Sequence, residues 1–166
     1  MNEMKSMLNA YDMMRSMAHQ MASSIDPTQF DVATDGANSV NWIVGHLALV
    51  ADMGSNLLGH PQTTIEQWSS VYGPGSPGGV VGDRGMSRDA VMEYFAAAHD
   101  RLRGHADNPD QSLLDAANET PFMSDALPTM GDLLAHVLTT HLGMHTGQIS
   151  QIRRQSGFDP VFQLPT

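Results

Sequence analysis

The chain has 166 residues, of which 41% are hydrophobic and none is cysteine. This length suits one domain with its own core, and the absence of cysteine excludes both a disulfide framework and a thiolate metal site. The formal net charge of −10 leaves no basic stripe for a phosphate backbone, so nucleic acid is not an expected partner.

Hydropathy gives no run of apolar residues long enough to cross a bilayer. The N-terminus also lacks the basic region and continuous apolar core of a signal peptide. We therefore expect a single domain over residues 1–166, in the cytoplasm and without a membrane partner.

The first predicted helix covers residues 3–24, where apolar side chains recur at steps of three and four. Methionine, a flexible filler of cores, dominates this stripe. Met13 and Met17 are additional to the stripe and are candidates for a homodimer interface. Pro27 is expected to stop the helix, and residues 26–37 form a polar connection rich in turn residues.

A second helix is predicted over residues 39–58, with Asn38 or Ser39 as N-cap and Gly59 at its end. A short helix over residues 63–72 is expected next. The segment 73–79 contains the spacing G-x-G-x-x-G, but no strand precedes it and its prolines lack the N–H donors that a phosphate needs. We interpret it as a loop that could cover a site.

The third predicted helix runs from Ser87, its N-cap, to about residue 105, and one helical turn is expected near Leu113 and Leu114. Thr129 with Asp132 resembles a capping box at the start of a fourth helix over residues 129–156. Four helices without a convincing strand predict an all-α four-helix bundle. The connection between the second and third helices is long enough to be a crossover.

The segment from His141 to Gln148 carries the main chemical signal. His141 and His145 lie on the apolar stripe of the fourth helix, and side chains four apart point the same way with Cβ atoms about 5–6 Å apart. Two such imidazoles can bind one metal ion at about 2.0–2.1 Å. The alternative is a hydrogen-bonded pair in the core. His136, five residues before His141, is expected to point away from the pair.

Two segments resemble the DinB/YfiT-like metalloenzyme family. They are 41–47, Asn-Trp-Ile-Val-Gly-His-Leu, and 132–149, with its His-x-x-x-His-Thr-Gly-Gln-Ile ending, and the order and spacing fit along most of the chain. The resemblance implies an up-down-down-up bundle with the crossover between helices two and three. It also implies that His46 joins His141 and His145 around one divalent ion, and that dimers are common.

Activity is less defined by the resemblance. Some relatives transfer or isomerise small-molecule substrates with a low-molecular-weight thiol, and many have no known reaction. Zinc, nickel and iron all suit three imidazoles, and an open position can lower the pKa of a bound water or thiol. A metal-dependent S-transferase or hydrolase is therefore one function class, and a non-catalytic metal-binding or stress-related bundle is the other.

Several further residues are candidates for the surroundings of the site. Trp42, His99 and Gln148 could line the pocket or orient a ligand. Glu119 and Asp125 are the carboxylates considered as a general base. Because ligand imidazoles must be neutral, metal affinity is expected to fall as the pH drops through about 6.5.

Overall fold

The structure is a computed structural model, and it describes residues 3–33, 38–76, 85–120 and 123–161. Its elements are α1 (Glu3–Ser23), α2 (Pro27–Phe30), α3 (Val40–Leu57), α4 (Thr64–Tyr72), α5 (Arg88–His105), α6 (Gln111–Leu114), α7 (Met130–His136), the π-helical segment η1 (Val137–His141) and α8 (Leu142–Gln155). No β-strand forms within the described ranges, so the prediction of an all-α chain is confirmed.

Local capping chemistry sets the ends of the long helices. The Ser39 hydroxyl accepts a hydrogen bond from a backbone N–H of α3, and Ser87 does the same for α5. Thr129 and Asp132 form the expected capping box of α7. Gly59 adopts a positive φ of 82° just after α3, a conformation that glycine tolerates without steric cost. The predicted helix bounds are accordingly correct to within one or two residues.

The connection after α1 contains a short helix that the sequence analysis did not predict. Asp26 caps α2 by accepting from the Thr28 N–H, and Pro27 occupies its first position. Proline suits this place because its missing N–H would have no partner inside the helix. Pro27 therefore begins one helix as well as ending another.

The fourth predicted helix is not continuous, because a π turn separates α7 from α8. Within this turn the Thr139 hydroxyl donates to the Ala135 carbonyl at 2.6 Å, and the Thr140 hydroxyl donates to the His136 carbonyl at 3.4 Å. Such hydroxyls compete with backbone N–H groups for the carbonyl four residues back. The wider turn brings residues five apart onto one face of the helix.

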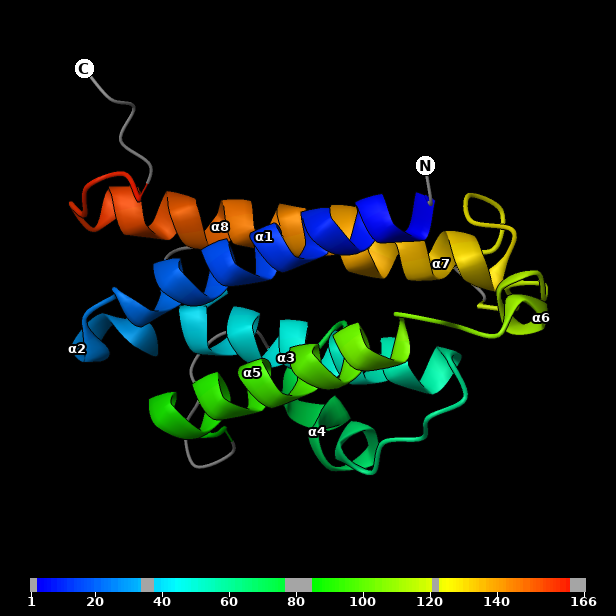
Figure 1. Ribbon diagram of the computed structural model, residues 1–166. Helices are drawn as coiled ribbons and strands as arrows, with labels where there is room; N and C mark the ends of the chain where they lie inside the picture. Colours follow the sequence, from blue (N-terminus) through cyan, green and yellow to red (C-terminus); the bar gives the residue numbers. More distant parts are fainter. Residues whose placement is uncertain (1–2, 34–37, 77–84, 121–122, 162–166) are drawn as a thin grey trace, which may run out of the picture.

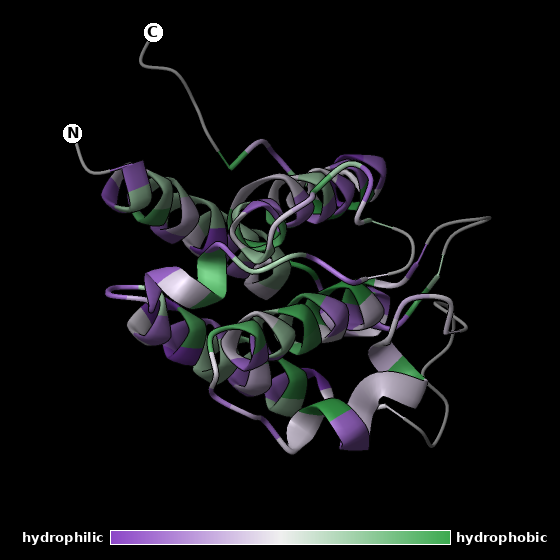
Figure 2. Ribbon diagram, turned by 90° about the vertical axis from the view of Figure 1, so that its right-hand side faces the viewer, coloured by the Kyte–Doolittle hydropathy of each residue, from purple (hydrophilic) through white to green (hydrophobic). Residues whose placement is uncertain are grey.

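The four long rods form two layers, with α1 beside α7–α8 and α3 beside α5 (Figure 1). Green and purple segments alternate along these helices in Figure 2, as expected of amphipathic helices around one core. The short helix α4 lies against α3 and belongs to the crossover from α3 to α5.

Cross-helix contacts give the direction of each rod. The hydrogen bonds of Tyr11 with His99 and of Arg88 with the Ser23 carbonyl make α1 and α5 antiparallel. A second set, Asn41 with Met86 and Asp52 with Arg101, makes α3 and α5 parallel. Contacts of Met14 with Gly143 and of Met21 with Arg153 make α1 and α8 parallel. The directions therefore follow an up-down-down-up order.

A buried carboxylate fastens the crossover to the bundle. Asp52 of α3 is fully buried and accepts from Arg101 of α5, from the Tyr94 hydroxyl and from the Thr64 hydroxyl at the start of α4. A buried charge is tolerated only when it is paired and hydrogen-bonded in this way. The network thereby fixes α4 against α3.

Surface features bear on two expectations. Met13 is 58% exposed, whereas Met17 packs partly against the core, so only Met13 has the exposure of an interface residue. Residues 77–79 of the glycine-rich loop lie outside the described ranges. None of the described helices is both long enough and apolar enough to cross a membrane.

Candidate metal centre

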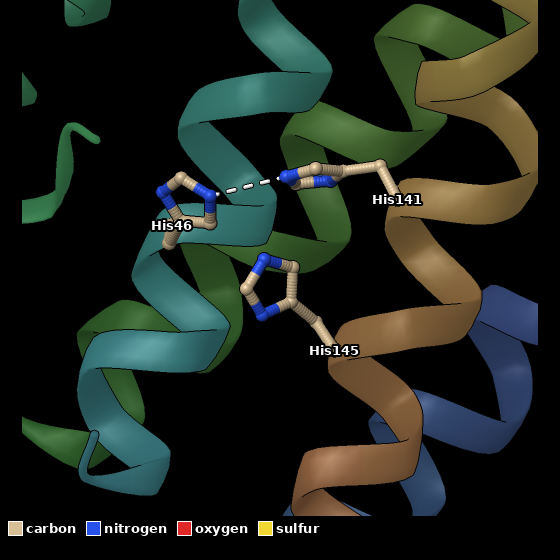
Figure 3. A group of neighbouring side chains, drawn as sticks. All are labelled: His46, His141 and His145. Carbon is tan, nitrogen blue, oxygen red and sulfur yellow. Dashed lines mark hydrogen bonds between the residues drawn. The ribbon is translucent and has the colours of Figure 1, made fainter. Parts of the chain in front are cut away.

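Three histidines converge where α3 faces η1 and α8 (Figure 3): His46 from α3, His141 from η1 and His145 from α8. The Nε2 atoms of His46 and His141 are 3.1 Å apart. His145 completes the cluster, with ring centroids 4.8 Å from His46 and 4.6 Å from His141. Each ring offers one nitrogen, and these three atoms lie within 4.8 Å of one another. This cluster is compatible with metal binding.

Hydrogen bonds on the far side of two rings define which nitrogen is free. The Nδ1 atom of His46 lies 2.7 Å from the Tyr72 carbonyl oxygen, which can only accept, so Nδ1 carries the proton. The Nδ1 atom of His145 lies 2.7 Å from the amide oxygen of Gln148 and carries its proton by the same argument. Both Nε2 atoms are therefore unprotonated and present a lone pair to the centre of the cluster.

The donor geometry fits a shared ion. Two nitrogens 3.1 Å apart, each about 2.0–2.1 Å from a metal, subtend about 100° at the ion, close to the tetrahedral angle of zinc. A hydrogen bond between His46 and His141 would give the same distance. The Nδ1 atom of His141 is buried and has no hydrogen-bond partner among the described residues.

Burial keeps the cluster neutral. It lowers the pKa of His46 to about 4 and that of His141 to about 3, and repulsion from the neighbouring rings adds to both shifts. Burial also lowers the pKa of His145, although the Gln148 hydrogen bond opposes this shift. Protons thus compete for these nitrogens at lower pH than the unperturbed value of 6.5 suggests. The imidazoles hold the form that a metal needs near neutral pH.

Contacts of α3 with the C-terminal end of α4 hold the His46 ring in position. The Trp42 ring stacks on His46 with centroids 4.6 Å apart, and its N–H donates to the Val71 carbonyl and the Ser76 hydroxyl. Gly45 permits the close approach of α4, since a Cβ there would lie 2.4 Å from the Tyr72 ring. No side-chain pattern could have predicted the contact of Tyr72 with His46, because it is made by the backbone carbonyl of Tyr72.

His136 lies next to the cluster, so the prediction that it points away is wrong. Its ring meets His141 edge to face with centroids 5.6 Å apart, and both line the same pocket. The π turn between them is the reason, because it aligns residues five apart. The Nδ1 atom of His136 is hydrogen-bonded to the Thr140 hydroxyl at 2.6 Å.

Of the three residues predicted to surround the site, two lie beside the histidine cluster and one does not. Trp42 lines the pocket and Gln148 contacts His145. His99 instead lies in the core, where its Nδ1 pairs with the Tyr11 hydroxyl at 2.7 Å, and it is absent from the pocket lining. Burial lowers the pKa of His99 to about 3.

Neither carboxylate considered as a general base reaches the cluster. Glu119 lies along a separate groove with Leu113 and Met130. Asp125 is exposed and is not among the residues that line the histidine pocket. Within the described residues, the pocket therefore offers imidazoles but no carboxylate for proton transfer.

The pocket beside the cluster has a volume of about 560 Å³ and is lined by all three histidines. Its walls come from α3, α7, η1 and α8 and from residues near Pro74, Thr120 and Met123. This volume lies in the range of small-molecule sites. A small molecule in this pocket would lie against the three histidines.

Comparison with known families places the three histidines within a matched family range. Residues 10–149 match the model of the DinB superfamily, and this range includes all three clustered histidines. Among the curated proteins and the solved structures compared with it, none matches the chain.

Proposed function

Because the chain belongs to the DinB superfamily, we propose that it binds one divalent metal ion through the Nε2 atoms of His46, His141 and His145 and acts as a metal-dependent enzyme on a small molecule. The observation that carries this proposal is the pair of acceptors that the Nδ1 atoms of two rings contact. The Tyr72 carbonyl and the Gln148 amide oxygen hold the protons of His46 and His145 on Nδ1, so their Nε2 lone pairs converge.

The surroundings of the cluster are suited to catalysis. A bound ion with three neutral ligands supplies a Lewis acid with an open position, and zinc, nickel and iron all suit this ligand set. Trp42 covers one face of His46, and most of the side chains that line the pocket beside the histidines are apolar. His136 adds a fourth imidazole to the pocket wall without entering the ligand cluster.

Two reaction classes are consistent with this site, namely thiol transfer and hydrolysis of a small substrate. Both need a metal position that a protein ligand does not close, and the pocket of about 560 Å³ beside the three histidines supports such a position. The alternative is a non-catalytic metal-binding or stress-related bundle. The absence of a carboxylate from the described pocket lining is the observation that favours this second class.

Metal content of purified variants tests the ligand set. We expect one equivalent of metal in the wild type and in His19→Ala, whose ring is exposed on α1. His46→Ala and His145→Ala should each lose most of it after dialysis against a chelator. Full stoichiometry and affinity in His46→Ala would reject the ligand set.

Turnover tests the function class. The metal-loaded protein is screened with thiols paired with electrophiles and with small hydrolysable esters and amides. Activity that requires metal and disappears in His145→Ala supports the enzyme. Metal binding without turnover of any of these substrates supports the non-catalytic class.

A further inference from the structure

The described walls of the histidine pocket are mainly apolar and carry no fixed charge. Nine of the fifteen described lining residues are hydrophobic, among them three methionines, Met53, Met123 and Met144. The other six are the four histidines, Asn56 and Thr120. No lysine, arginine, aspartate or glutamate belongs to this lining in the part of the chain that the structure describes.

Such walls discriminate against charged ligands. A carboxylate, phosphate or ammonium group loses its hydration on entering an apolar pocket and needs a counter-charge there to recover that free energy. The described walls supply none, so the proposed ion would be the counter-charge for the donor atom that binds it but not for a charge elsewhere on the ligand. The net charge of −10 adds an unfavourable field for anions approaching from solution.

From this lining we infer that the pocket binds a neutral, mainly apolar small molecule that presents a single donor atom to the metal. The donor-atom part rests on the proposed function, whereas the apolar part rests on the walls alone. The side chains of Asn56 and Thr120 can hydrogen-bond one uncharged polar group. The flexible methionines let the walls fit apolar bodies of more than one shape.

Met144 and Met13 provide a matched pair of variants. Both are exposed methionines on helices, with 56% and 58% of their surface accessible, but only Met144 lines the pocket. Because both positions are exposed, a lysine at either one should leave the fold of the wild type intact. Met144→Gln, of similar length but uncharged, separates the effect of charge from the loss of methionine.

The first experiment uses metal-free protein and the neutral apolar fluorophore N-phenyl-1-naphthylamine. We expect saturable binding to the wild type and to Met13→Lys, and roughly tenfold weaker binding to Met144→Lys because a charge now lies beside the apolar body. Met144→Gln should lie nearer to the wild type. Equal binding to Met144→Lys and Met13→Lys, or no binding to the wild type, would overturn the apolar assignment.

The second experiment uses cobalt(II)-loaded protein and two thiols that differ only in the body attached to sulfur. We expect 2-phenylethanethiol to bind at least roughly tenfold more tightly than 3-mercaptopropionate, as read from the sulfur-to-cobalt absorption band. The ratio of the affinities for the two thiols should be smaller in Met144→Lys than in the wild type, and it should be unchanged in Met13→Lys. A preference of the wild type for 3-mercaptopropionate would overturn the inference while leaving the metal centre intact.

Failure of the metal proposal gives a different pattern. If the wild type fails to bind cobalt(II) while the fluorophore still binds more tightly to the wild type and Met13→Lys than to Met144→Lys, the proposed function is wrong. In that case the inference that the ligand presents a donor atom to a metal is wrong as well. The apolar pocket is then supported by itself. The two proposals are thus separated by whether the metal or the apolar probe fails to bind.

Discussion

The rings of His136 and His141 lie edge to face with centroids 5.6 Å apart, although five residues separate them. In a regular α-helix, a separation of five residues turns a side chain by about 140° around the axis. The π turn over Val137–His141 removes most of that angle. The pocket consequently contains a fourth imidazole that helical periodicity had excluded.

Replacing His136 should change the pocket but not the metal content. We expect His136→Ala to retain one equivalent of metal with affinity within about threefold of the wild type, since its nitrogens are outside the ligand cluster. His141→Ala should lose affinity strongly. Competition with a coloured chelator measures the metal affinity of both variants. Loss of metal in His136→Ala but not in His141→Ala would show that His136, and not His141, is the ligand.

Gly45→Ala should weaken the contacts between α3 and α4 that hold the His46 ring in position. The new methyl group would lie 2.4 Å from the Tyr72 ring, so α4 must shift, at a cost of about 1–3 kcal/mol in the free energy of unfolding. Metal affinity should fall too, because the Tyr72 carbonyl orients His46. Urea unfolding and metal titration measure the two effects.

Gly104→Ala is the matched control for Gly45→Ala. A Cβ at Gly104 of α5 meets nothing within 4 Å, so alanine should stabilise the helix by about 0.5–1 kcal/mol and leave metal affinity unchanged. Equal destabilisation by the two substitutions would contradict the role given to the close approach of α4.

Gln148 should contribute to metal affinity without touching the ion. Its amide oxygen fixes the proton of His145 on Nδ1, and loss of such a contact typically costs 10–100-fold in affinity, so we expect about this loss for Gln148→Leu. Gln148→Glu keeps an acceptor and should recover most of it. Gln151→Leu, at an exposed position on the same helix, is the control. Identical affinities in Gln148→Leu and Gln151→Leu would remove Gln148 from the site.

Acid should destabilise the metal-free protein through the buried histidines. The pKa of His46 is about 4 in the folded state and about 6.5 in the unfolded state. Between these values the unfolded state binds more protons, so the free energy of unfolding rises with pH, by about 1.4 kcal/mol per pH unit for one such group. Above pH 6.5 both states are neutral and His46 contributes no further change.

Urea unfolding of metal-free wild type and His46→Gln between pH 4.5 and 7.5 isolates this contribution. Groups remote from His46 titrate alike in both proteins and cancel in the difference. His141, whose pKa the His46 ring helps to lower, adds to the difference in the same direction. The wild type should lose more stability than His46→Gln as the pH falls from 6.5 to 4.5. Parallel curves for the two proteins would show that His46 is protonated as easily in the folded chain as in the unfolded one.

The sequence alone predicted the long helices of this protein and the shared helix face of two of its three clustered histidines. Apolar periodicity and the capping side chains of Ser39, Ser87 and Thr129 predicted the long helices, because these signals act within a few residues of one another. The four-residue spacing of His141 and His145 also placed them on one face. His46 was connected to them only by the family resemblance, since nothing local relates α3 to α8.

Tertiary structure alone decided how the site is assembled. The 3.1 Å approach of His46 to His141 depends on helix packing, and the acceptor for His46 is a backbone carbonyl of Tyr72, a group that every residue possesses. His99 lies in the core, where it is hydrogen-bonded to Tyr11, 88 residues away in the sequence. The π turn that brings His136 to the pocket contains Thr139 and Thr140, whose hydroxyls donate to carbonyls four residues back. Helical periodicity in a sequence does not show where such a turn replaces a regular α turn.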